Sequence, residues 1–137
     1  MWRWLAIIAV LLGVGVWASR SFDHWPQRHR VDRIFTAVEH GDLERAYAEY
    51  VNDPDWRVHP PREYSFDEFY RDWGPSGDFG AIWAHEIECL FPASNDSGTR
   101  GYLVVIRLNH RVAGLRALWV SEDGKMVERR NATPACG

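Results

Sequence analysis

The chain has 137 residues, enough for one domain and too few for two of ordinary size. Its hydrophobic (46%) and charged (26%) contents are typical of a globular protein, and eight tryptophans supply large apolar surfaces for a small core. The formal net charge of −3, with acids and bases interspersed, excludes the broad basic surface of a nucleic-acid-binding protein.

The first twenty residues are the most apolar stretch. No charged side chain occurs between Trp4 and Ser19, and a helix of that run spans roughly 24 Å, close to the ~30 Å hydrocarbon core of a bilayer. Side chains that favour the membrane–water interface flank it: Trp2, Arg3, Trp17 and Arg20. The sequence predicts a single-pass transmembrane anchor over residues 1–20, in contact with lipid through residues 2–19.

The alternative for this segment is a signal peptide, cleaved after "VWA" at Ser19, which would leave a secreted domain. Bulky Trp17 lies where a cleavage region is usually small and polar, which favours a retained anchor. Arginines after the segment favour a cytoplasmic domain, whereas the very short N-terminus favours export. We expect the domain to be extracytoplasmic.

After a linker over residues 21–30, the pattern predicts an α+β domain over residues 31–131 and a flexible tail over residues 132–137. Apolar residues at helical spacing predict two consecutive helices, separated by Gly41, and a third helix begins with the capping-box pair Ser65 and Glu68. Four β-rich runs bounded by turn residues follow: "GAIWAHEIECLF", "RGYLVVIRLNH", "GLRALWVSE" and "KMVERR". The order predicts three helices packed on one face of a curved antiparallel sheet of about four strands.

Alternation along the strands predicts which side chains face the helices. The expected core-facing sets are Trp83, His85, Ile87, Cys89 and Phe91 in the first strand, Tyr102, Val104, Ile106 and Leu108 in the second, and Leu115, Ala117 and Trp119 in the third. On the opposite face, apolar side chains would be open to solvent and could pair two copies in a homodimer: Leu103, Val105, Leu118 and Val120.

His85 is the one basic side chain on the predicted core face of the three long strands. It could act as a base or contact a ligand in a pocket lined by Trp83, Tyr102 and Trp119. The alternative, which we favour, is a core histidine bonded to a tyrosine hydroxyl or a backbone carbonyl. Cys89 is expected to be a small buried apolar residue, and a bridge to Cys136 is the less favoured outcome. The sequence predicts no catalytic set, no metal site and no cofactor, because no ligand or nucleotide-binding spacing occurs.

The helix pair "FTAVEHGDLERAYAEYV", the short helix "SFDEFYRDW" and the strand pair "YLVVIRL" and "LRALWVSEDGKMV" resemble the nuclear transport factor 2-like, or cystatin-like, superfold. They are most similar to small bacterial members with one N-terminal membrane helix and no known function. The resemblance covers roughly residues 27–131 and implies a cone-shaped domain enclosing a pocket. Only "WRVHP" is available for the strand that relatives place between the second and third helices.

Such relatives include both enzymes and binding modules. We expect a membrane-tethered, non-catalytic binding or protein-interaction module of the cell envelope, with a small apolar ligand or an envelope protein as partner. The alternative is a ketosteroid-isomerase-like or polyketide-cyclase-like enzyme that uses His85 as its base.

Overall fold

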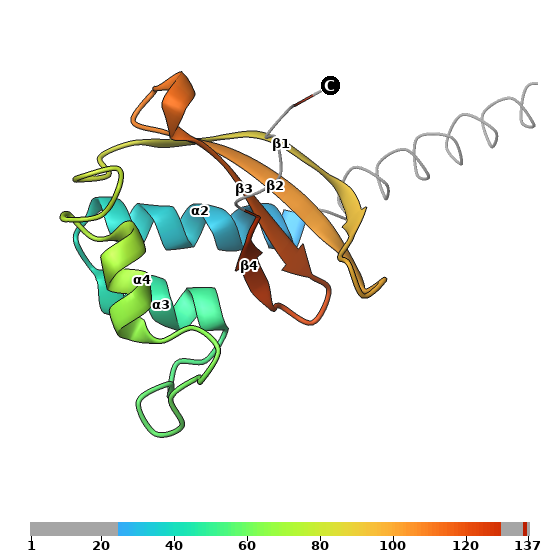
Figure 1. Cartoon of the computed structure of the whole chain (residues 1–137), viewed down its shortest axis with the longest axis horizontal. Helices are drawn as coiled ribbons and strands as arrows, with labels where there is room; N and C mark the ends of the chain where they lie inside the picture. The colour runs from blue at the N-terminus through green and yellow to red at the C-terminus, as the bar shows by residue number, and fades with distance from the viewer. Residues whose placement is uncertain (1–24, 130–135, 137) are drawn as a thin grey trace, which may run out of the picture.

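The computed structural model describes residues 25–129 and 136 of the chain. Helices α2 (Trp25–Glu39), α3 (Leu43–Val51) and α4 (Phe66–Trp73) precede an antiparallel sheet of β1 (His85–Ser94), β2 (Arg100–Leu108), β3 (Leu115–Ser121) and β4 (Met126–Glu128). A 3₁₀ turn, η1 (Val112–Gly114), connects β2 to β3. Figure 1 shows α2 running along the sheet, with α3 and α4 gathered at one end of it. The predicted α+β class, three helices and four-stranded antiparallel sheet are confirmed.

The predicted anchor lies outside the described residues, as do residues 21–24 of the linker and most of the tail. The rest of the predicted linker differs from expectation, because residues 25–30 form the first turns of α2. Pro26 lies in the first turn, where a missing N–H removes no helical hydrogen bond. Within the part of the chain that the structure describes, no helix combines the length and the apolar character needed to cross a bilayer.

The capping residues delimit the two shorter helices. The Asp42 side chain accepts from the backbone N–H of Arg45 at the start of α3, and Asn52 ends that helix in the left-handed region, at φ 56°. Ser65 and Glu68 form the predicted capping box of α4, with each side chain accepting from the other residue's backbone N–H. These bonds supply partners for N–H groups that a helix start leaves unpaired.

The core lies between α2 and the sheet. The predicted stripe of α2 is buried, with Ile34 and Phe35 among the least exposed side chains, and it packs against core residues of β2 and β3. Phe69 and Trp73 of α4 close the core at the end where α3 and α4 meet, and Trp73 packs edge-on against Phe35 at 5.3 Å between ring centroids. Side chains of this core occupy the space between α2 and the sheet, where a pocket was expected.

A bulge in β1 changes the predicted faces. Ile87 pairs with Ile106 and Cys89 with Val105, so Glu88 is an extra residue that β2 does not match. His85 and Ile87 therefore face the helices as expected, but beyond the bulge it is Leu90 that packs on the core. The expectation that Cys89 and Phe91 face the helices is wrong, because one inserted residue reverses the alternation.

The predicted faces of β3 are also reversed. Val104 pairs with Leu118 and Tyr102 with Val120, which places Leu118 and Val120 in the core. Trp119, expected in the core, lies on the far face of the sheet. Both faces of this strand carry apolar side chains, so alternation by itself does not decide which set faces inward; the register imposed by the η1 connection does.

Arg30 joins three parts of the domain. Its buried guanidinium donates to the carbonyls of Glu49 and Tyr50 at the end of α3, and to the carbonyl of Gly124 in the turn before β4. Burial lowers the pKa of Arg30, and the nearby Glu49 carboxylate opposes that shift. The side chain therefore fixes α2, α3 and the last hairpin relative to one another.

We expect Arg30→Met to lower the free energy of unfolding by about 3 kcal/mol, because several buried carbonyls lose a charged donor while the aliphatic stem is kept. A urea titration of the full chain in mild detergent measures the loss. Arg28→Met, at an exposed position of the same helix, is the control, with an expected change under about 0.5 kcal/mol. Equal losses in the two variants would contradict the assigned role of Arg30.

The capping box gives stability a pH dependence. Hydrogen bonds from the backbone and hydroxyl of Ser65 lower the pKa of Glu68 below its ordinary value of 4.5. Stability from this group is thus fully present above pH 4.5 and is lost as pH falls through the lower folded-state value. Glu68→Gln should flatten the acid side of the stability profile, measured by urea titrations at several pH values. An acid slope equal to that of the parent chain would contradict this prediction.

Candidate functional site

The four residues predicted to line a pocket do not all lie on the helix-facing side of the sheet. Trp83 is 59% exposed, with its ring edge-on to His110 at 5.3 Å. Tyr102 lies in β2 between Pro92 and Val120, towards the opposite end of β1 from His85. Trp119 is buried on the far face, with its indole N–H 3.5 Å from the carbonyl oxygen of Ala93. His85 lies between the sheet and α2, where it contacts two side chains of that helix.

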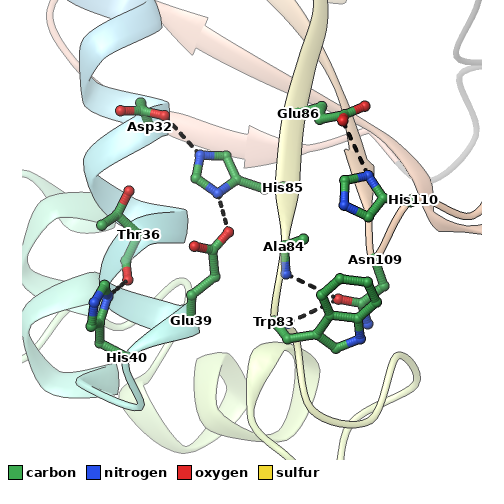
Figure 2. A network of polar contacts seen from close by, with 10 residues as sticks. All are labelled: Asp32, Thr36, Glu39, His40, Trp83, Ala84, His85, Glu86, Asn109 and His110. Atoms are coloured by element: carbon green, nitrogen blue, oxygen red, sulfur yellow. Dashed lines mark hydrogen bonds and ion pairs between the residues drawn. The ribbon is translucent and has the colours of Figure 1, made fainter.

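His85 is held between two carboxylates of α2 (Figure 2). Its Nδ1 contacts Oε1 of Glu39, and its Nε2 lies 2.8 Å from Oδ1 of Asp32. Asp32 and Glu39 are seven residues apart, two helical turns, so both reach the same side of α2. The His85 side chain is 8% exposed. The expected hydroxyl or carbonyl partner is therefore wrong: the partners are carboxylates on a helix, which strand alternation does not reveal.

This arrangement restricts what His85 can do chemically. Both ring nitrogens of His85 contact carboxylate oxygens, whichever nitrogen carries the proton. A general base instead needs a ring nitrogen with a free lone pair directed at the substrate. The geometry gives His85 the role of a latch that fastens the edge strand β1 to α2.

Asn109 positions the chain segment that leads into His85. Its Oδ1 accepts from the backbone N–H groups of Trp83 (2.8 Å) and Ala84 (3.3 Å), and its Nδ2 donates to the carbonyl of Ala81 at 3.0 Å. Figure 2 shows the amide reaching from the end of β2 to the backbone before β1. Asn109 has φ 53°, a conformation that asparagine tolerates better than most residues. Asn109 was not among the residues predicted to be functional, although an Asn directly after a strand is a usable signal.

A disulfide joins Cys89 of β1 to Cys136, with 5.8 Å between their Cα atoms. The expectation of an unbridged Cys89 in the core is wrong, because the bulge turns this side chain to the far face. The bridge closes a loop of 47 residues, which in the chain-entropy model contributes about 4 kcal/mol. It also ties the C-terminal end of the chain to the edge strand.

The four side chains expected to form an exposed dimer interface do not lie together on one exposed face of the sheet. Leu118 and Val120 belong to the core, and Val105 on the far face is only 1% exposed. Ala117 and Trp119 on that far face are buried as well. An apolar surface made of the four predicted side chains is thus not present on the single chain.

A groove of about 520 Å³ lies between α4 and the turn that joins α2 to α3. Three aromatic rings (Phe66, Tyr70, Trp73) and three carboxylates (Glu39, Asp42, Glu44) are among its lining residues, and none of the described lining residues is Lys, Arg or His. No sequence motif indicates this groove. Its two walls are separated by more than twenty residues, and only the packing of α4 brings them together.

The structure and the comparisons with known proteins assign no cofactor or family. Within residues 25–129 and 136, no group of three His, Cys, Asp or Glu side chains is placed to hold a metal ion. No family model, curated protein or solved structure matches the chain. The observations that bear on function are therefore the disulfide, the His85 latch and the groove.

We expect His85→Ala to lower the free energy of unfolding by about 2 kcal/mol, because it leaves the half-buried Glu39 carboxylate without its partner. His110→Ala is the matched control, since His110 pairs with Glu86 at 3.1 Å on the exposed surface and such pairs contribute under about 1 kcal/mol. Urea titrations of the full-length variants compare the two losses. A smaller loss for His85→Ala than for His110→Ala would contradict the latch.

Proposed function

We propose that this chain is a membrane-tethered, non-catalytic binding domain of the cell envelope, with a nuclear transport factor 2-like, or cystatin-like, arrangement of its helices and sheet. The tether is the apolar segment over residues 2–19, and the domain lies on the extracytoplasmic side. The resemblance of the helix pair and strand pair to small membrane-anchored bacterial proteins supports this assignment, as does the observed order of three helices followed by four antiparallel strands.

The observation that carries the proposal is the bridge between Cys89 and Cys136. Stable disulfides form in oxidising compartments such as the bacterial periplasm and are rare in the cytosol. An apolar, export-competent N-terminal segment followed by a domain closed by a disulfide is the combination expected of an envelope protein. The disulfide thus supports the extracytoplasmic orientation over the cytoplasmic one that the flanking arginines favour.

The enzyme alternative has weaker support. Proton abstraction next to a carbonyl requires a base with a free lone pair and a cavity that admits the substrate. Both nitrogens of His85 contact carboxylates, and the space between α2 and the sheet is filled by the core. A binding role needs neither a free base nor an open interior, and it is the function that we propose.

Expression of the full chain in a bacterium tests the tether and the compartment together. We expect full-length mass in the carbonate-washed membrane fraction, with both cysteines unreactive towards a maleimide until a reductant is added. Leu11→Arg should remove the protein from the membrane, because an arginine at the centre of a spanning helix costs about 3 kcal/mol relative to an apolar residue. Leu11→Val is the matched control and should behave like the parent chain.

Two outcomes would contradict the proposal in different ways. Full-length protein in the cytosol with two reactive thiols would remove both the tether and the envelope location. A soluble product whose mass begins at or near Ser19 would replace the tethered domain by a secreted one.

A further inference from the structure

The groove between α4 and the α2–α3 turn has the composition of a binding site for a positively charged organic group. We propose that it binds a small organic cation, whose ammonium group lies against the carboxylates and the aromatic rings and whose apolar part lies on the groove floor. This inference names a ligand class for the binding role proposed above, but it does not depend on the tether or the compartment. Figure 1 shows this part of the domain at the end where α3 and α4 meet.

The charge of the groove favours a cation. Glu39, Asp42 and Glu44 line it. Among the described residues, His85 contacts Glu39, Arg57 pairs with Glu44, and Arg45 and His40 line a neighbouring hollow together with Asp42. His85 is shared with Asp32, and one oxygen of Asp42 accepts the capping hydrogen bond at the start of α3. An excess of negative charge remains, so an anion would be repelled.

The aromatic lining gives the groove selectivity for an organic cation over a metal ion. Tyr70 is 44% exposed and packs edge-on against Phe66, at 6.2 Å between centroids. Ring faces attract quaternary ammonium groups, whose methyl groups cover the charge and leave no tightly bound water shell to be removed. A metal ion needs several converging oxygen or nitrogen ligands, and the described residues hold no such group. The rings therefore favour a ligand whose charge is surrounded by carbon.

Beside the groove, a cation of the protein itself is already held by an aromatic ring and a carboxylate. The Arg57 guanidinium lies 4.5 Å from the centre of the Trp56 ring and pairs with the Glu44 carboxylate. Trp56 in turn stacks on Phe66, at 5.1 Å between centroids. The groove lining supplies the same two kinds of group, with aromatic rings from Tyr70 and Trp73 and a carboxylate from Asp42.

The size and floor of the groove indicate a small molecule. Its volume of about 520 Å³ lies within the roughly 300–1,000 Å³ typical of small-molecule sites. Buried Leu43 and Ile82 supply an apolar floor. A ligand that fills this space needs an apolar body as well as a charged head.

The test compares choline with 3,3-dimethylbutan-1-ol, which has nearly the same shape and no charge. Binding to the full chain in nanodiscs, with the disulfide intact, is measured by saturation-transfer NMR. We expect saturable binding of choline at millimolar concentration and at least about tenfold weaker binding of the neutral alcohol, since the charge carries the cation–π and carboxylate contacts. A longer alkyltrimethylammonium ion should bind more tightly than choline, because it also covers the floor.

Two pairs of variants locate the site. Asp42→Asn with Glu44→Gln removes two groove charges and keeps an amide at the α3 cap, and it should weaken choline binding about tenfold. Asp67→Asn with Asp96→Asn removes two exposed charges outside the groove and should leave binding unchanged. Tyr70→Leu should weaken binding, whereas Tyr70→Phe, which keeps the ring, should not.

Several results would overturn the inference. These are the absence of saturable choline binding, equal binding of the neutral alcohol, or equal effects of the groove and control pairs. A lysine-containing peptide that binds far more tightly than any free ammonium ion would replace the small molecule by a basic polypeptide. None of these results alters the membrane location or the state of the disulfide, so failure of this inference is distinguishable from failure of the proposed tethered envelope domain.

Discussion

Glu88, the extra residue of the bulge in β1, is the constraint on which two attachments of this edge strand depend: the contacts of His85 with α2 and the disulfide of Cys89. Before it, His85 faces α2 and contacts two carboxylates; after it, Cys89 faces away from the helices and reaches Cys136. Without a bulge, alternation would place both side chains on one face, and the strand could not be latched to a helix on one side and bridged on the other. One residue thus allows a single edge strand to be fixed from both faces.

An edge strand fixed in this way is also a poor template for aggregation. Strand β1 is long, with an outer edge that pairs with no strand among those the structure describes. The bulge, Pro92 and the charged side chains of Glu86 and Glu88 are devices that discourage pairing with another chain. Such protection matters during folding, when an unpaired edge is exposed to other chains.

Because core side chains fill the interior, the candidate binding surface lies on the outside of the helical layer. Phe35, Phe69 and Trp73 occupy the space beneath the sheet, and Arg30 holds α3 and the last hairpin in place around it. The groove forms where α4 approaches the α2–α3 turn, so its shape depends on the same packing that fills the core. Binding outside a rigid core needs little rearrangement of the domain.

The sequence by itself determined the class of fold, because helical spacing, capping residues and β-rich runs bounded by turns are local. The helices and strands that they predict are present in the described residues. It also identified the Ser65–Glu68 capping box and the helix-facing position of His85. Tertiary structure alone decided the faces of β3, the bulge, the disulfide, the carboxylate partners of His85 and the groove. Those features depend on register and on contacts between residues far apart in the chain, and a pattern that is apolar on both faces of a strand contains no information about which face turns inward.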